Sequence, residues 1–571
     1  MRESAHLYLG MYTLRDRRTG ELFDRWSDLG DKRRRLLERS WAGVFRNHLL
    51  DELPVGDLCR HLDERLGRPS KDLHVVIGVL LLQQLHDLGD AATVEALAFN
   101  MAWHYALDVR GEADSYFCEK TLRNYRRLFI EQGLDGLLFR HLTDRLVRAF
   151  AVDTSRQRMD STALRSAMRA LTRLGIVVET ISKFARQLER LHPDLYGQIG
   201  DEVIRRYVVR EGDGCFANTA PSVSRRRLGE AGQDLLALAM QFRGTPAARL
   251  AGFAIMERVL RDRFGIVDDD CGDQGVPVVA VRKPMDVPCD TVGNPADPDA
   301  SYNAHKGQGY VAQIVETYCE DGEGDGEVAA TPDIITHVAV HKMTVHDGHR
   351  LSDVLDDLNN RSLAPAVMLA DSHYGSGDNM AMTREQGIGL VAPARPAKGA
   401  SSGRLTLEDF ILDEKGLVRR CTNNIEPAST SIAKAKPRAR FDFSIRQKCP
   451  HTQLCPVHVA KRDSHFAHFQ YMPSRAANQK RRLYEQSDAF RDIYRWRAGI
   501  EASMSRLKYQ MNLSPSTHSW HARHAPRRQS ARPRFQYPVM QRHRAIKNIC
   551  LGLQSATDFL PARRILCMAL K

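Results

Sequence analysis

Apolar residues recur at three- and four-residue steps through the first roughly 150 residues, a pattern typical of helices with one buried face. Turn sequences rich in Gly and Pro separate these periodic segments. The helices predicted there are Lys32–Phe45, Asp72–His86, Ala92–Trp103 and Lys120–Ile130. A second long helical stretch is predicted from Ser166 to Phe264, with breaks at Gly212–Gly214 and Ala220–Pro221.

Short runs rich in β-branched residues, bounded by Gly, Pro and Asp, predict strands outside these helical segments. One predicted strand carries Arg158-Met159-Asp160, directly after the N-terminal helices. A helix is predicted over Arg350–Asn359, between the second and third of the later strands. Those later strands are Gly309–Tyr318, Ile334–Met343, Ala366–Ala370 and Ile388–Ala392. The chain is therefore predicted to be an α/β protein with helical additions.

A row of polar residues near the end of the chain has the spacing Y-x2-R-x3-E-x6-K, formed by Tyr494, Arg497, Glu501 and Lys508. On one helix these positions fall within an arc of about 60° and extend about 21 Å. An apolar stripe lies about 80–90° away from this row. It consists of Ile493, Trp496, Ile500, Met504, Leu507 and Met511. The pattern predicts an anchored helix that presents Glu501 between cations, although a surface helix with solvated charges has the same pattern.

This block resembles the signature around the last acidic residue of insertion-sequence DDE transposases. Two earlier segments, Arg158–Thr162 and Ala366–Gly375, are similar to the segments that carry the first two acids of that family. Asp297–Ala300, followed by His305–Tyr310, resembles the core of one subgroup. The N-terminal region is similar to the helical InsH-type domain of these proteins. The resemblance extends from about residue 7 to residue 512.

The resemblance and the order of the elements imply an RNase H-like catalytic core with a helical N-terminal domain and insertions. The core is expected to be assembled from separate segments of the chain. The expected division is a DNA-binding domain at 1–152, the core at 153–168, 297–399 and 481–513, a helical insertion and linker at 169–296, a second insertion at 400–480, and a basic tail at 514–571.

The resemblance assigns catalysis and metal binding to Asp160, Asp371 and Glu501. Two divalent cations about 3.5–4 Å apart can activate the attacking oxygen and neutralise the leaving oxygen of a phosphodiester. Mg²⁺ favours oxygen ligands and keeps several waters, so a few convergent carboxylates are enough. We expect two Mg²⁺ or Mn²⁺ ions, both bound by Asp160, with Asp371 and Glu501 each holding one.

The same resemblance implies that Tyr494 and Arg497 contact transposon-end DNA and that Lys508 binds a phosphate. Arg497 also lies one helical turn before Glu501, so a structural ion pair between them is an alternative. In the N-terminal region, three arginines are predicted to share one helix face. They are Arg123, Arg126 and Arg127. Such a face suits a phosphate backbone or a major groove, and a solvated basic helix has the same sequence pattern.

The composition agrees with a DNA-binding protein. The 571 residues have a formal net charge of +13 and a pI near 9.2, which favours an acidic polymer as partner. Eleven scattered cysteines predict free thiols in a reducing compartment. Residues Met1–His6 have no apolar segment typical of a signal peptide, and the run Val75–Leu82 is too short to cross a bilayer. We therefore expect a cytoplasmic, nucleoid-associated protein that binds double-stranded DNA and no membrane.

Several other acidic and Cys/His motifs allow a metal site but have simpler explanations. Asp321–Gly326 begins like a calcium loop, but Pro332 occupies the place where a Glu ligand is needed. Asp297 and Asp299 sit beside prolines and favour a turn. His346-Asp347 is either a pair supporting the site or the start of a turn. Asp268–Asp270 is predicted to be a linker. Zinc binding is the minority interpretation of the cluster Cys421, Cys449, His451, Cys455 and His458, because its C-x5-C spacing is not that of a structural zinc site.

The resemblance weakens after Leu513, where residues 514–547 are rich in Pro, His, Arg and Ser without apolar periodicity. One interpretation is a disordered basic arm that binds DNA phosphates. The other is a compensated frameshift in a decayed copy. The implied function is binding of terminal inverted repeats, cleavage at the transposon ends and strand transfer by a homodimer in a synaptic complex. A nuclease or resolvase without strand transfer, or a domesticated protein that only binds DNA, are the alternatives.

Overall fold

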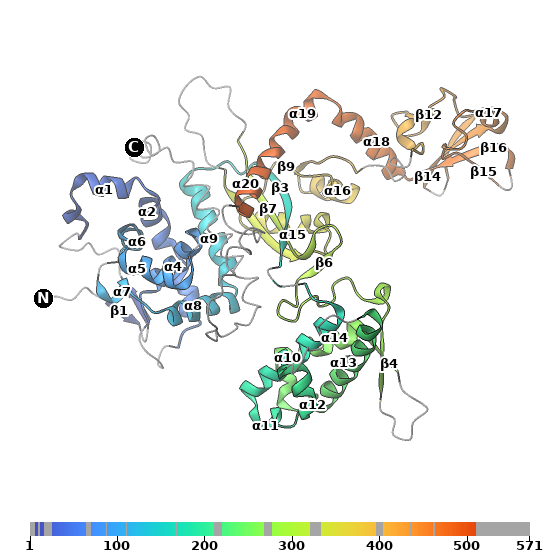
Figure 1. The fold of residues 1–571 in the computed structure, drawn as a ribbon. Helices are drawn as coiled ribbons and strands as arrows, with labels where there is room; N and C mark the ends of the chain where they lie inside the picture. The colour runs from blue at the N-terminus through green and yellow to red at the C-terminus, as the bar shows by residue number, and fades with distance from the viewer. Residues whose placement is uncertain are drawn as a thin grey trace.

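The computed structural model describes residues 6–9, 12–15, 25–63, 70–209 apart from residues 87, 110, 167 and 169, 220–267, 277–319, 333–395, 403–460 apart from residue 434, and 463–509. In this part of the chain, buried apolar side chains form three hydrophobic cores. Figure 1 shows the corresponding parts: a helical N-terminal part beside a central sheet, a green helical part, and an orange part at the end of a long helical connection.

The central sheet has the order β10-β9-β3-β7-β6, and β8 also pairs with β7. Its strands are β3 (Arg156–Arg165), β6 (Ser301–Asn303), β7 (Gly307–Thr317), β8 (Ile335–Lys342), β9 (Val367–Leu369) and β10 (Gly389–Val391). Strand β3 is antiparallel to β7 and parallel to β9. Helices α15 (Leu351–Asn360) and α16 (Gly377–Glu385) connect the later strands. The predicted α/β, RNase H-like core with helical additions is confirmed.

The N-terminal part consists of helices preceded by a short hairpin, β1 (His6–Leu9) and β2 (Tyr12–Arg15). The helices are α1 (Asp31–Glu38), α2 (Trp41–Val44), α3 (Val55–Cys59), α4 (Leu73–Leu85), α5 (Asp90–Phe99), α6 (Met101–Leu107), α7 (Glu112–Ser115), α8 (Glu119–Glu131) and α9 (Leu134–Ala149). The predicted continuous helices over 32–45 and 92–103 are wrong. Each is divided where a polar side chain caps a new helix: Ser40 accepts from the Ala42 amide and Asn100 from the Ala102 amide.

Helix α9 joins the N-terminal helices to the central sheet. One hydrophobic core runs through both, and it includes Leu142 of α9, Val315 of β7 and Leu355 of α15. Arg140 pairs with Asp357 at 2.9 Å across the same boundary. The N-terminal helices are therefore packed against the sheet rather than joined to it by a linker alone.

A helical insertion between β3 and β6 has its own hydrophobic core, in which Phe184 contacts Phe242 and Phe253. Its elements are α10 (Arg173–Leu191), α11 (Pro193–Tyr196), α12 (Asp201–Val203), α13 (Pro221–Phe242), α14 (Ala251–Arg263), β4 (Phe264–Val267) and β5 (Val278–Val281). The predicted helical character of this stretch is confirmed for its described residues, with β4 and β5 added as a hairpin.

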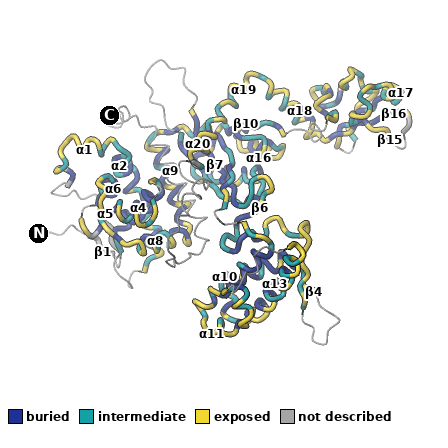
Figure 2. Tube along the Cα trace, viewed as in Figure 1, coloured by how far each residue is buried: buried dark blue, intermediate teal, exposed yellow. Residues whose placement is uncertain are grey.

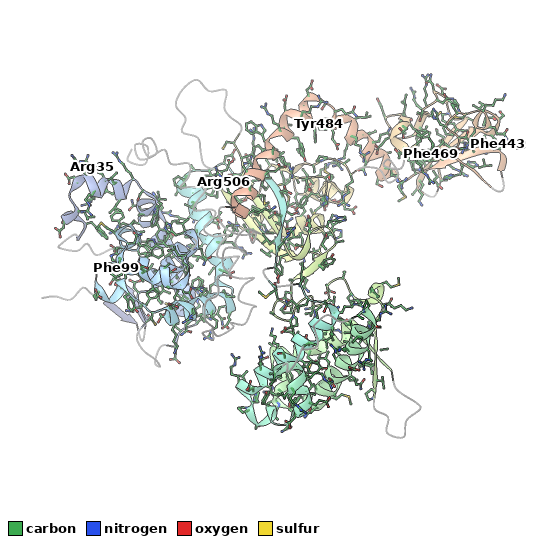
Figure 3. The ribbon with its side chains drawn as sticks, in the orientation of Figure 1. Arg35, Phe99, Phe443, Phe469, Tyr484 and Arg506 are labelled. Atoms are coloured by element: carbon green, nitrogen blue, oxygen red, sulfur yellow. The ribbon has the colours of Figure 1, made fainter. Side chains whose placement is uncertain are left out.

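A second insertion follows β10 and contains a four-stranded antiparallel sheet of order β13-β14-β16-β15. Its elements are β11 (Ile411–Leu412), β12 (Val418–Arg420), β13 (Ser429–Ala433), β14 (Lys436–Asp442), α17 (Phe443–Gln447), β15 (His458–Ala460) and β16 (Asp463–Gln470). Phe469, labelled in Figure 3, belongs to its small core. Helix α18 (Pro473–Glu485) returns the chain to the central sheet.

No single helix of the described residues is long and apolar enough to cross a membrane. The bent pair α4 and α5 meets the length and composition criteria only when the two are taken together. Most of α4 is buried, as the dark tube in Figure 2 shows.

Candidate active site

The polar row near the end of the chain does not lie on one continuous helix. Helix α19 (Asp488–Tyr494) is followed by a 3₁₀ turn over Arg495–Ala498, and α20 (Gly499–Tyr509) begins after that turn. The predicted single helix is therefore wrong at Arg495–Ala498. At this turn the Arg158 guanidinium packs against Gly499, where a Cβ atom would lie 2.1 Å from Nη1. A larger residue at this position would force the guanidinium to move.

The apolar side of the segment is anchored as predicted. Ile500 and Met504 are buried in the core that contains the central sheet. Trp496 stacks on Tyr318 with ring centroids 6.4 Å apart. The side chain of Leu507 and all of Met511 lie outside the described residues. Helix α20, on which Figure 3 labels the exposed Arg506, is therefore fixed beside the sheet.

The buried cation Arg158 links three parts of this region. Its Nε donates to Glu316 Oε1 on β7 at 2.7 Å and its Nη2 to Asp333 Oδ2 at 2.8 Å. Its Nη1 donates to the carbonyl of Trp496 at 2.9 Å. Burial raises the pKa of Glu316, while the charge of Arg158 and a hydrogen bond from Ser503 act in the opposite direction. These contacts, which we call the Arg158 clamp, hold the start of α20 against β3 and β7.

Arg497 brings the first and last predicted acids to one place. Its Nη2 donates to Asp160 Oδ2 at 2.6 Å, and its Nη1 donates to Glu501 Oε1 at 3.0 Å. Burial raises the pKa of Asp160; Arg497 lowers it, and the negative charges of Asp371 and Glu501 raise it again. The ion pair between Arg497 and Glu501 is thus present, and Asp160 shares the same guanidinium.

Asp371 follows the end of β9, and its Oδ1 accepts from the His373 amide at 2.8 Å. The buried Tyr374 lies near three aspartates of this region. Burial raises the pKa of Tyr374, and the charges of Asp347, Asp371 and Asp160 raise it further. Asp347 accepts from the Ser161 hydroxyl at 2.6 Å, next to Asp160 in sequence. Of the two interpretations of His346-Asp347, the structure shows both: His346 caps a 3₁₀ turn, and Asp347 contacts the strand of the first acid.

Tyr494 precedes Glu501 in the sequence, and Lys508 follows it. Tyr494 is half-buried and stacks on Phe490, with ring centroids 5.1 Å apart. Burial, opposed by Arg497 and reinforced by Asp371 and Asp160, raises the pKa of Tyr494 to about 12. Lys508 is half-buried in the last turn of α20.

The three arginines of α8 do not share one exposed face, so that prediction needs correction. Arg126 turns inward, donates to Gln83 Oε1 at 2.9 Å and pairs with Asp90; only 11% of its side chain is exposed. Arg127 is 62% exposed and lies 3.9 Å from Glu131. Helical periodicity placed Arg126 on the same face as the other two arginines. It could not show that Asp90, on a different helix, pairs with Arg126.

The other acidic motifs have structural roles where they are described. Asp297 accepts from the hydroxyls of Ser166, at 2.5 Å, and Tyr310, and its backbone forms the expected turn. Asp268–Asp270, Asp321–Gly326 and the tail after 509 lie outside the described residues.

The thiols of the second insertion lie near one another. Cys421, Cys449 and Cys455 are free; burial raises the pKa of Cys455, and the charges of the other two add to this.

The donor set of the site suits a hard divalent cation. Asp160, Asp371 and Glu501 supply carboxylate oxygens, which Mg²⁺ prefers. The Arg497 guanidinium already acts as the cation between Asp160 and Glu501. Among the described residues, however, no three His, Cys, Asp or Glu side chains are placed to hold one ion. The carboxylate oxygens are of the kind that Mg²⁺ prefers, and two of these carboxylates contact the Arg497 guanidinium in this structure.

Comparison with protein families gives two matches. A transposase domain (DUF772) matches residues 44–128, which include most of the N-terminal helices. The transposase DDE domain, which is RNase H-like, matches residues 328–525 and includes Asp371 and Glu501. The comparisons with curated proteins and with solved structures gave no match. The fold and these two domain matches support a DDE transposase. A transposase domain near the N-terminus followed by a DDE domain is consistent with an insertion-sequence DDE transposase.

Proposed function

We propose that this transposase binds the terminal inverted repeats of its element, cleaves DNA at the element's ends and joins the freed 3′ hydroxyls to target DNA. The observation that carries the proposal is the Arg497 bridge between Asp160 on β3 and Glu501 on α20. It brings together two acids from opposite ends of the catalytic core. Asp371 is close enough to influence the pKa of Asp160.

Asp160, Asp371 and Glu501 would hold two Mg²⁺ or Mn²⁺ ions, which activate the attacking oxygen and neutralise the leaving oxygen when bound. Arg497 lies between Asp160 and Glu501 and would contact the DNA strand beside these carboxylates. A guanidinium binds phosphate oxygens in a bidentate manner, so Arg497 is suited to position the strand. Tyr494 lies on the preceding helical turn and would contact the same strand.

Double-stranded DNA of the nucleoid is the proposed partner, both at the transposon ends and at the target. Lys508 on α20, with Arg123 and Arg127 on α8, would bind phosphates, which position a protein on DNA without reading sequence. Arg126 is left out of this set because it is buried against Asp90. Synapsis of two ends calls for at least a homodimer.

The experiment is cleavage of an end-labelled duplex taken from the DNA that flanks the gene, with Mg²⁺ or Mn²⁺. Ala in place of Asp160, Asp371 or Glu501 should abolish cleavage and leave duplex binding largely intact. Asp378→Ala is the matched control, because it removes an exposed carboxylate on α16 outside the site. Cleavage by the Asp371→Ala protein at the wild-type rate would contradict the assignment. Joining of the cut strand to a second duplex distinguishes transposition from cleavage alone.

A further inference from the structure

Three imidazoles and one guanidinium gather beside Asp371, where the loops that follow β8 and β9 meet. The rings of His346 and His349 have centroids 5.1 Å apart, and His346 stacks on His373 at 5.7 Å. Arg395 Nη2 lies 2.5 Å from His346 Nε2 and donates to the carbonyl of His373 at 3.1 Å. We call these four residues the His/Arg cluster. His349, His373 and Arg395 are exposed, so a ligand can reach it.

The backbone beneath the cluster is closely packed. A Cβ atom on Gly348 would lie 2.4 Å from the carbonyl oxygen of His373, so the two loops touch through their main chains. Asn379 joins the same loops, because its Nδ2 donates to the carbonyls of both Gly348 and Tyr374 at 2.9 Å. The cluster is thus preformed, which lowers the entropy lost when a ligand binds.

The hydrogen bonding of His346 indicates what kind of ligand fits. Its Nδ1 accepts from the Gly348 amide at 3.1 Å. Its Nε2 faces Arg395 Nη2, which can only donate. A neutral imidazole has one acceptor nitrogen, so one of these two contacts sets N–H groups against each other. Burial first, and then the charge of Arg395, lowers the pKa of His346. An anionic oxygen bound beside His346 Nε2 and Arg395 Nη2 would relieve this conflict by accepting from both.

We propose that the His/Arg cluster binds one backbone phosphate of the DNA strand that reaches Asp371. The inference rests on the proposed function, which brings a DNA strand to this carboxylate. A phosphate oxygen can accept from His346 Nε2 and from the Arg395 guanidinium together, and a guanidinium is the side chain best matched to phosphate geometry. A metal cation fits less well, because His346 Nδ1 already accepts a hydrogen bond and Arg395 is positively charged. The cluster would thus fix the position of the strand beside the carboxylates.

Salt dependence of duplex binding tests the proposal. Each phosphate contact contributes about 0.9 to the slope of log Kobs against log[salt]. Arg395→Ala should lower the slope by about that amount, and Arg395→Lys, which keeps the charge, should retain most of it. Arg384→Ala is the matched control, since it removes an exposed arginine at the end of α16 and should leave the slope unchanged. A thermal melt of each variant checks that it is folded. An unchanged slope for folded Arg395→Ala protein would overturn the proposal.

Neutral methylphosphonate linkages, introduced one at a time into the duplex, locate the contact. At one position the methylphosphonate should lower the duplex affinity of the wild-type protein but leave the affinity of the Arg395→Ala protein unchanged. An equal effect on both proteins at every linkage would refute a phosphate contact by Arg395. Inorganic phosphate tests whether the cluster binds a free anion instead of DNA. If phosphate raises the Tm of the wild-type protein but not of Arg395→Ala, and the two proteins have equal salt slopes for DNA binding, the assignment to DNA is wrong.

Failure of the proposed function is separable from these outcomes. If the wild-type protein does not cleave DNA but Arg395→Ala still lowers the salt slope, the phosphate subsite is supported and the proposed transposase chemistry is contradicted. If the wild-type protein cleaves DNA and Arg395→Ala leaves the salt slope unchanged, only the phosphate subsite is contradicted.

Discussion

Arg158→Met tests whether the Arg158 clamp holds α20 against the sheet. The substitution removes a guanidinium whose side chain is 8% exposed and leaves Glu316, only 2% exposed, without its partner. Breaking a buried ion pair in this way costs about 3–5 kcal/mol, because an uncompensated charge remains in the interior. The contact with Asp333 adds little to this figure, because that carboxylate is 32% exposed.

Amide hydrogen exchange of residues 499–509 is the assay, since urea unfolding of a chain with several cores is not a two-state process. If α20 opens locally, a loss of about 3 kcal/mol makes its exchange at least about a hundredfold faster. The double variant Arg158→Met/Glu316→Leu replaces the pair with apolar side chains and should recover most of the protection. Wild-type exchange in Arg158→Met, or a double variant as fast as the single one, would refute the clamp.

The pH dependence gives the same variant a second readout. Burial raises the folded-state pKa of Glu316 above its ordinary value of 4.5, even with Arg158 in place. A carboxyl with a raised pKa is most favourable to folding below 4.5, and its stability is lost as pH rises through the folded-state pKa. Loss of Arg158 raises that pKa further. The deficit of Arg158→Met should therefore shrink as pH falls toward 4.5, and a deficit that grows would contradict this account.

Three further predictions concern the packing around the site and in the N-terminal helices. Gly499→Ala places a Cβ atom 2.1 Å from Arg158 Nη1, so it should accelerate amide hydrogen exchange in α20. The acceleration should be smaller in the Arg158→Met background, and equal effects in both backgrounds would show that the two residues act independently. The hydrogen bond from His337, with the charges of His337, Arg140 and Arg361, lowers the pKa of Asp357 to about 2 against the opposing effect of burial. Asp357→Asn should thus be less stable than wild type above pH 3.8, and the Tm difference should disappear as pH falls toward 2. Asn100→Ala removes the cap of α6 and should cost about 1 kcal/mol, measured as faster amide hydrogen exchange of residues 101–107; unchanged exchange would show that the cap is unimportant.

The order of strands and helices could be predicted because each element has its own local signal. The strand pattern around Met159 and the period-3.6 pattern of α15 depend on residues close together in sequence. The convergence of Asp160 and Glu501 could be expected only from the family resemblance. Periodicity gives no information about which elements pack together.

The features that the sequence did not reveal depend on contacts between distant segments. Arg158 has its partners at Glu316, Asp333 and Trp496, and neither spacing nor composition relates these positions. The buried position of Arg126 could not be predicted either, because its partners Gln83 and Asp90 lie on other helices. The capped starts at Ser40 and Asn100 did carry a signal, because Ser and Asn favour the N-cap position.

We propose that Asp160, Asp371 and Glu501 form one metal-dependent centre. Titration of the DNA-bound protein with Mn²⁺, followed by electron paramagnetic resonance, tests it most directly. The wild-type protein should bind two ions, as a two-metal mechanism requires, and each single Ala variant should lose at least one, whereas Asp378→Ala should lose none. Unchanged Mn²⁺ stoichiometry in the Asp371→Ala and Glu501→Ala proteins would contradict the account.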